Sequence, residues 1–260
     1  MVFYQSIMWN VQTYSELPST QTLAREQLDS GIARHGDVFV ALHQSSGRGQ
    51  YHWREWYDEP GTNLLLSIVL TEVASEVIDL MQFLTGLTVL ATIRSLLERE
   101  LRFFDPSRVQ LKWPNDILLD GKKISGILSE AVWNGNSLRG IVIGIGINVN
   151  QDYFVSSVAT KAIGLKSVLQ YTLPLNEARD LLLATMQYTL QHYHDRQRLL
   201  HDLRAELAWM GDVTITATTP DDRTFEQAMI RGVTDNGAII IRTATGEEHT
   251  LQTATITFSL

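Results

Sequence analysis

The stretch from residue 109 to residue 150 constrains the fold more than any other part of the chain. It reads VQLKWPNDILLDGKKISGILSEAVWNGNSLRGIVIGIGINVN, in which short apolar segments are separated by Asp120-Gly121 and Asn134-Gly135. Asp-Gly and Asn-Gly between apolar segments favour tight hairpin turns, because such turns need residues that adopt a positive φ. The stretch therefore predicts a meander of antiparallel strands.

Helices and buried strands are predicted before the meander. We expect a helix after Pro18, with Ser19 and Thr20 as candidate caps and an end at Gly36. DVFVALHQ predicts a buried strand, and NLLLSIVL predicts one buried on both faces. Residues 75–101 carry a broad apolar face and predict a long helix.

The sequence changes character again in its last quarter. A second helical region covers about 176–208, and short β segments separated by turn residues follow Trp209-Met210-Gly211. About fifty residues in short strands suit a small barrel. We therefore expect one domain at 1–208 and a second at 209–260.

Composition excludes several classes of function. The 260 residues include no cysteine, which excludes disulfides, Cys₄ zinc sites and thiol catalysis and permits a reducing compartment. The formal net charge of −8 gives no general attraction to nucleic acid. No apolar stretch approaches the roughly twenty residues of a membrane span, and the N-terminus does not resemble a signal peptide. We expect a cytoplasmic protein that binds neither DNA nor membrane.

Three stretches carry groups suited to chemistry. GRGQYHWREW (47–56) places Arg48 between glycines, where backbone N–H groups and a guanidinium can both meet an anion. KWPNDILLDGKKISGILSE (112–130) gathers lysines, an amide and a carboxylate at the mouth of one hairpin. GIVIGIGINVN (140–150) leaves one strand face nearly bare, as where a ligand or another chain approaches closely.

Each stretch also has an ordinary structural interpretation. The first can be a solvated loop, and the third can be a glycine-weakened core strand. In the second, Asn115-Asp116 can cap the local backbone while Lys122 faces solvent. Asn148 can bind a ligand or cap a turn. The sequence contains no GxSxG, HExxH, EF-hand, P-loop or GxGxxG motif. The residues alone leave these alternatives open.

The order and spacing of the motifs resemble the biotin–protein ligases (biotin–acetyl-CoA-carboxylase ligases). The resemblance runs through STQ, QSSGRGQ, KWPND, KKISGILSE and GIGINVN, and the C-terminal MGDVTIT and TGEE segments look like that family's small domain. It implies an α+β fold: a mixed, largely antiparallel sheet packed with helices, as in class II synthetases, plus a small SH3-like β-barrel. Only about eighteen residues precede STQ, so we expect a monofunctional form without the N-terminal DNA-binding domain.

The activity that the resemblance implies is ATP-dependent attachment of biotin to a lysine of a biotin carboxyl carrier protein. The intermediate is biotinoyl-5′-AMP, and Mg²⁺ accompanies ATP. This carbon–nitrogen bond formation needs no protein nucleophile; it needs cations where two anions meet, alignment, and exclusion of water. The alternatives are a lipoate- or octanoate-transferring relative and a biotin-binding protein with impaired ligase activity. Some relatives form homodimers through a sheet edge, and GIVIGIGIN would supply one here.

The resemblance also assigns roles to residues. Lys123 bridges the biotin carboxylate and the α-phosphate, Arg48 gathers carboxylate and phosphate oxygens, and Asp116 orients or deprotonates the acceptor lysine; these three are the catalytic set. The biotin-binding set is Ser19, Thr20, Gln21, Gln44, Gly47, Arg48, Lys123, Gly126 and Leu128. The ATP-binding set is Arg48, Gly49, Gln50, Lys112, Asn115, Lys123 and Asn148. No metal ligand is assigned.

The glycine loop departs from the family pattern GRGRxGRxW. Gln50 stands where a second Arg is common, and Tyr51-His52-Trp53 replaces a residue plus Gly, with one residue inserted before Trp56. Arg54 is the candidate substitute for the last loop Arg. We interpret QYHWREW as a lid with altered closure, because losing a Gly stiffens a loop that must fold over its ligand.

Overall fold

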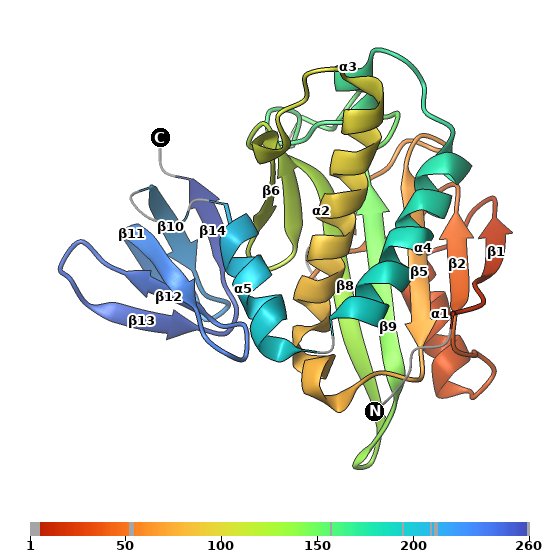
Figure 1. Ribbon diagram of the computed structural model, residues 1–260, viewed down its shortest axis with the longest axis horizontal. Helices are drawn as coiled ribbons and strands as arrows, with labels where there is room; N and C mark the ends of the chain where they lie inside the picture. Colours follow the sequence, from red (N-terminus) through yellow and green to blue (C-terminus); the bar gives the residue numbers. More distant parts are fainter. Residues whose placement is uncertain are drawn as a thin grey trace.

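The computed structural model describes residues 6–51, 55–156, 158–193, 195–208, 210 and 213–258. Its larger sheet has seven strands in the order β1-β2-β5-β9-β8-β7-β6 (Figure 1). β1 runs parallel to β2, and the other neighbours are antiparallel. The strands are β1 Asn10–Tyr14, β2 Asp37–Ala41, β5 Leu64–Leu70, β6 Val109–Lys112, β7 Asp116–Leu119, β8 Lys122–Asn134 and β9 Ser137–Ile147. The predicted mixed, largely antiparallel sheet is confirmed.

The meander predicted for 109–150 forms strands β6 to β9 of this sheet. Asp120 and Gly121 turn the chain between β7 and β8 with φ of 52° and 74°, the consecutive positive values that favour Asp-Gly. β9 pairs with β5 on one side and β8 on the other. The expectation that GIVIGIGIN presents a free sheet edge is therefore wrong, because both sides of β9 are hydrogen-bonded. The described edges of the sheet are β1 and β6.

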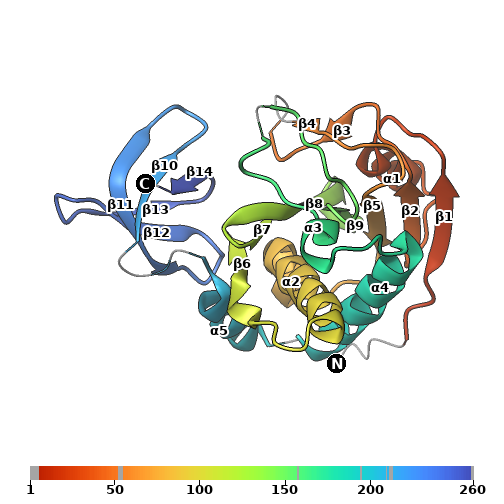
Figure 2. The same cartoon turned by 90° about the horizontal axis from the view of Figure 1, so that it is seen from above.

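Helices cover both faces of the sheet. α2 (Met81–Glu100) and α4 (Leu175–His192) pack on one face, and α1 (Thr20–Asp29) packs on the other (Figure 2). Alternate residues of each strand point to opposite faces. Leu64, Leu66 and Ile68 of β5 join the large core under α2 and α4, whereas Val69 joins a small cluster beneath α1.

α1 begins where the sequence predicts and ends earlier. The side chain of Ser19 accepts a hydrogen bond from the backbone N of Thr22, as an N-cap does. The helix ends at Asp29 instead of continuing to Gly36, because Gly31 adopts a φ of 73° that breaks the helical backbone. Ile32 consequently lies outside the helix and is 64% exposed.

The helix predicted at 75–101 consists of two parts. Ser75–Leu80 form the short 3₁₀ helix η1, and α2 follows. By length and composition alone, the helical segment Glu76–Glu100 could cross a membrane. The expectation that the chain contains no such segment is therefore wrong. However, 78% of the apolar window is buried inside the protein. The apolar residues of this helix therefore belong to the protein core.

The second helical region and the small sheet also form as predicted. The remaining helices are η2 Pro106–Arg108, α3 Leu165–Leu169 and α5 Arg196–Glu206. The C-terminal strands, in the spatial order β13-β12-β11-β10-β14, are β10 Thr214–Thr218, β11 Thr224–Val233, β12 Ile239–Arg242, β13 Glu248–Leu251 and β14 Thr255–Phe258. Register shifts in β10 and β11 bend this antiparallel sheet. In the described part of the chain β13 and β14 do not pair, so the expected barrel is not closed.

The small sheet lies beside β6, and α5 contacts both β6 and β11 (Figure 1). The indole Nε1 of Trp113 donates to the backbone carbonyl of Gly237 at 2.9 Å. The guanidinium of Arg196 on α5 contacts both the carboxylate of Asp79 and the backbone carbonyl of Asp235. The KWPND segment therefore lies at the junction of the two sheets.

Candidate functional site

One cavity brings the separate sequence motifs together. It has a volume of about 110 Å³ and lies among the start of α1, the glycine strands β8 and β9, and the short hairpin of β3 (Gly47–Arg48) and β4 (Glu55–Trp56). The predicted residues that line it are Ser19, Thr20, Gln21, Gln44, Arg48, Gly49, Gln50, Asn115, Asp116, Lys123, Gly126 and Leu128. Gly47, Lys112 and Asn148, which we also predicted, are not among its lining residues.

One end of the cavity carries neutral hydrogen-bonding groups. Gln44 Oε1 accepts from the backbone N of Thr20 at 2.8 Å and from its hydroxyl at 3.1 Å. The hydroxyl of Ser67, on β5, lies 2.9 Å from Thr20 Oγ1 and 3.1 Å from Gln21 Oε1. Because its oxygen is engaged, the Gln44 amide presents its N–H₂ group as a donor. This end therefore combines amide donors with hydroxyl and amide oxygens.

The glycines of β8 and β9 form the floor of the cavity. A Cβ placed on Gly146 would lie 2.8 Å from the Trp56 indole, and one placed on Gly126 would lie 2.9 Å from the same ring. A Cβ on Gly144 would lie 2.6 Å from Gln21 Oε1. We predicted that a ligand or another chain would closely approach the strand face that lacks side chains. In the structure, the side chains of Trp56 and Gln21 make this approach.

The other end of the cavity is charged. Lys123 Nζ lies 2.6 Å from Asp116 Oδ1, and Lys112 Nζ lies 3.6 Å from Asp116 Oδ2. Lys112 and Asp116 are directly opposite each other across the KWPND turn between β6 and β7. Asn115 Nδ2 donates to the carbonyl of Ile127 at 3.0 Å, which fixes the turn on β8. Two ammonium groups and one carboxylate thus gather at this end.

The backbone on both sides of Lys123 is held in place. Its N–H donates to the carbonyl of Lys161 at 2.7 Å, and its carbonyl accepts from the N–H of Ile163 at 3.0 Å. Asn148 is buried, and its Nδ2 lies 3.4 Å from the carbonyl of Lys123 and 3.2 Å from that of Ile163. The Asn148 amide therefore supports the backbone of Lys123 without lining the cavity itself.

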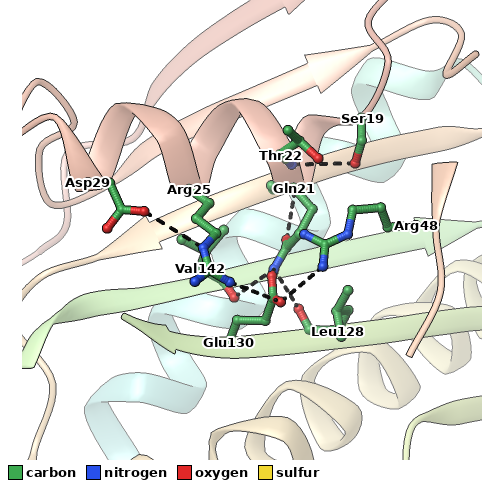
Figure 3. Close-up of polar contacts among 10 residues, drawn as sticks. Ser19, Gln21, Thr22, Arg25, Asp29, Arg48, Leu128, Glu130 and Val142 are labelled. Carbon is green, nitrogen blue, oxygen red and sulfur yellow. Dashed lines mark hydrogen bonds and ion pairs between the residues drawn. The ribbon is translucent and has the colours of Figure 1, made fainter. Parts of the chain in front are cut away.

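Arg48, on β3, lines the cavity. Its Nη2 is 3.3 Å from Glu130 Oε1, and its side chain is 41% exposed. Gln21 Nε2 donates to Glu130 Oε2 at 2.8 Å, and Arg25 Nη1 lies 3.5 Å from Glu130 Oε1. Figure 3 shows these side chains converging on Glu130 from α1 and β3. Arg48 is thus ion-paired to a carboxylate of β8.

The β3–β4 hairpin is held at its base and along its length. His43 Nδ1 and Asp58 Oδ2 lie 2.9 Å apart, and Asp58 Oδ1 accepts from the backbone N of Gln44. Beyond β3, the hydroxyl of Tyr51 lies 2.8 Å from that of Thr253 in the small domain. His52, Trp53 and Arg54, on which the lid prediction also depended, lie outside the described residues.

A second hollow extends from the cavity toward the small domain. Four residues line both spaces: Gln50, Asn115, Ile127 and Leu128. The other side of the hollow is formed by Asn236, Gly237 and Gln252 of the small domain. The cavity and the domain junction are therefore neighbouring parts of one surface.

The sequence interpretation missed three residues that shape the site. These residues are Trp56, Ser67 and Glu130, to which the resemblance assigns no role. Two signals were available. A lone hydroxyl in NLLLSIVL is a buried polar group that needs partners. Glu130 follows Gly126 and Leu128 at the spacing of two that places strand residues on one face.

In the described part of the chain, no group of three or more His, Cys, Asp or Glu side chains gathers to hold a metal ion.

The fold places a cavity with neutral hydrogen-bonding groups and a lysine–carboxylate cluster beside the C-terminal sheet. The chain belongs to the biotin/lipoate A/B protein ligase family, whose model matches residues 14–148. The biotin protein ligase C-terminal domain model matches residues 212–259.

Known proteins of this kind resemble the chain to different extents. It is 36% identical over 135 residues to the bifunctional ligase/repressor BirA of Bacillus subtilis, covering 52% of this chain and 39% of that protein. It is 27% identical over 239 residues to the biotin–[acetyl-CoA-carboxylase] ligase of Paracoccus denitrificans, covering 89% of this chain and 95% of that protein. The chain thus spans well under half of the Bacillus relative.

Solved structures show the same fold. The biotin protein ligase from Aquifex aeolicus in complex with biotin and ATP superposes with a TM-score of 0.76 at 22% identity, covering 96% of this chain and 99% of that one. The Leishmania major biotin protein ligase in complex with biotinyl-5-AMP gives a TM-score of 0.66 at 20% identity, covering 94% and 99%. The α+β architecture predicted from the resemblance is confirmed.

Proposed function

We propose that this chain is a biotin–protein ligase. It condenses biotin with ATP to biotinoyl-5′-AMP and then transfers the biotinoyl group to a lysine of a biotin carboxyl carrier protein. One observation carries the proposal: a single cavity has neutral amide and hydroxyl groups at one end and Lys123, Lys112 and Asp116 near the other. Biotin has the same polarity, with a neutral cyclic urea at one end and a carboxylate at the other.

The neutral end is suited to the urea ring. A cyclic urea has N–H donors and a carbonyl acceptor, and Thr20, Gln21, Gln44 and Ser67 offer partners of both kinds. A site built from buried hydrogen-bonding groups discriminates strongly against ligands that leave those groups unpaired. Lipoate, which has a dithiolane ring without N–H or C=O groups, would leave this end unpaired. This chemistry favours biotin over the lipoate-transferring alternative.

The charged end is suited to the first step. A biotin carboxylate oxygen attacks the α-phosphorus of ATP; a new P–O bond forms and pyrophosphate leaves. Two anions repel each other on this path, and a cation between them lowers the barrier most when it is already oriented. We assign that role to Lys123, whose ammonium is held by Asp116 and whose backbone is held by residues 161–163. Arg48 adds a second cation at the cavity wall.

The second step joins the biotinoyl group to the carrier. The acceptor lysine Nζ attacks the carbonyl carbon of the mixed anhydride; a C–N bond forms and AMP leaves. The attacking amine must be neutral, so a carboxylate that takes or orients its proton assists the attack. We assign this role to Asp116, which lines the cavity and is 14% exposed.

We propose that Mg²⁺ enters with ATP as part of the substrate, and that the β3–β4 hairpin and the following loop shield the adenylate from water. We place the domain boundary between residues 208 and 209 and the protein in the cytoplasm. The two family models, which match 14–148 and 212–259, support two domains.

Pyrophosphate release tests the proposal. The purified chain should release pyrophosphate from MgATP when biotin is added, and an excess of lipoate should not compete. Release driven by lipoate and not by biotin would establish the lipoate alternative. Tight biotin binding without pyrophosphate release would establish a binding protein with impaired ligase activity.

A further inference from the structure

We infer that Glu130 is a positioning residue for biotin binding in the cavity. It acts through two cavity residues, Gln21 and Arg48. The inference rests on the proposed function. Glu130 is absent from the cavity lining, yet its two carboxylate oxygens hold one cavity residue each. It lies on β8 opposite Val142 of β9, two residues beyond the Leu128–Gly144 pair of the cavity floor.

The first effect of Glu130 is to set the orientation of the Gln21 amide. An ionised carboxylate only accepts hydrogen bonds, so the nitrogen of Gln21 must face it. That nitrogen lies 2.8 Å from Glu130 Oε2 and 3.3 and 3.4 Å from the carbonyls of Val142 and Leu128. Gln21 Oε1 consequently faces Ser67 and the floor at Gly144. The cavity receives an acceptor at this point, and the reverse orientation would present a donor.

The second effect is to hold the β3–β4 hairpin on the sheet. The hairpin has only two residue pairs, Gly47↔Trp56 and Arg48↔Glu55. Such a short ribbon has little stability of its own, so side-chain contacts must fix its position. The Arg48–Glu130 pair links β3 directly to β8, and the Glu130 side chain is 20% exposed. This hairpin carries Trp56, which covers the glycine floor.

Substitution of Arg25 distinguishes a role of Glu130 in positioning cavity groups from a role in stabilising the fold. It lies 3.5 Å from Glu130 and 3.7 Å from Asp29 but does not line the cavity. If Glu130 merely stabilised the fold by pairing with arginines, the loss of Arg25 and the loss of the carboxylate would have similar consequences. If Glu130 positions cavity groups, only the loss of the carboxylate changes biotin binding.

The test compares Glu130→Gln with the wild-type chain in biotin-dependent pyrophosphate release and in biotin titration calorimetry. We expect the biotin KM and Kd to rise about tenfold, the effect of one hydrogen bond to a charged group. The ATP KM and the kcat at saturating biotin should change less than the two biotin constants, because the Lys123–Asp116 pair keeps its contact. An unchanged biotin Kd, or equal changes in the KM values of biotin and ATP, would overturn the inference.

Matched controls distinguish positioning from stability. The Glu206 carboxylate accepts two hydrogen bonds from Arg94, at 2.8 and 2.7 Å, and lies outside the cavity. Glu206→Gln removes this carboxylate. This variant and Arg25→Ala should lower the melting temperature without changing the biotin Kd. In the presence of Gln21→Ala, Glu130→Gln should have a smaller effect than it has alone. Full additivity would show that Glu130 does not act through Gln21.

The outcomes also separate this inference from the proposed function. Wild-type activity with an unchanged biotin Kd for Glu130→Gln would contradict the inference alone. Biotin binding by the wild-type chain without pyrophosphate release would contradict the proposed function, and the calorimetric Kd values would still decide the role of Glu130. A wild-type chain that binds no biotin would contradict both.

Discussion

Lys123 Nζ and Asp116 Oδ1 lie 2.6 Å apart at the charged end of the cavity, on neighbouring strands of one hairpin. The pair joins the cation proposed for the first step to the carboxylate proposed for the second. Each side chain limits the conformations of the other, so both are held before any substrate arrives. Preorganisation of this kind makes charged groups effective in catalysis.

Replacement of Lys123 should abolish the first step. Lys123→Ala removes the cation between carboxylate and α-phosphate, and we expect adenylate formation to fall about 10²–10³-fold. Biotin-dependent exchange of labelled pyrophosphate into ATP measures this step. Lys122→Ala is the matched control, because the preceding lysine is exposed and lines no part of the cavity. Equal effects of the two substitutions would contradict the assignment.

Replacement of Asp116 should affect the second step more than the first. Asp116→Asn keeps the size of the side chain but accepts no proton, so transfer from preformed biotinoyl-AMP to the carrier should slow about 10²-fold or more. Single-turnover assays separate transfer from adenylate formation. A transfer rate equal to that of the wild-type chain would show that another group receives the proton.

The glycine floor should tolerate no side chain. In Gly146→Ala the new methyl group would meet the Trp56 indole at 2.8 Å, so the hairpin must shift. We expect weaker biotin binding and a loss of stability of about 1–3 kcal/mol from overpacking. Gly232→Ala is the control, since a Cβ there meets nothing within 4 Å and φ is not positive. Calorimetric titration and thermal unfolding measure both effects.

The contact between the hairpin loop and the small domain should help to retain the adenylate. Tyr51→Phe removes the hydroxyl that lies 2.8 Å from Thr253 Oγ1 and costs about 0.5–1.5 kcal/mol of loop docking. We expect biotinoyl-AMP to dissociate about two- to tenfold faster, measured by chasing bound labelled adenylate with unlabelled ligand. An unchanged dissociation rate would show that this contact does not secure the loop.

The pH dependence of stability should report the contact between α5 and η1. The hydrogen bond from Arg196 lowers the pKa of Asp79 below its ordinary value. A depressed carboxyl pKa contributes stability above the unfolded-state pKa, and this stability is lost as the pH falls through the folded-state pKa. Asp79→Asn should therefore lower stability at pH 7 and leave it nearly unchanged in strong acid. Denaturant unfolding at both pH values checks the sign.

Much of the fold could be predicted from local patterns. Asp120-Gly121 fixed the hairpin of β7 and β8 because few residue pairs adopt two positive φ values. The predicted end of α1 lies several residues too late. Helical apolar spacing continues to Ile32 in the sequence, but the positive φ of Gly31 ends the helix before it. Pairing on both sides of β9 is a long-range property, and no local pattern in GIVIGIGIN reports its neighbours.

The site was predicted in its parts and not in its geometry. The motif residues Thr20, Gln44 and Lys123 line one cavity. The pairing of Arg48 with Glu130 was not foreseen, because the two residues are 82 positions apart in the sequence. The roles of these residues in binding and catalysis remain predictions that the substitutions above address.

Transfer of biotin to a carrier protein is the direct test of the proposed ligase activity. The chain is incubated with biotin, MgATP and a biotin carboxyl carrier domain, and the carrier is analysed by intact mass and peptide mass spectrometry. We expect one biotinoyl group on one carrier lysine, formed only when ATP and biotin are both present and lost with Lys123→Ala. A folded chain that binds biotin and leaves a competent carrier unmodified would contradict it.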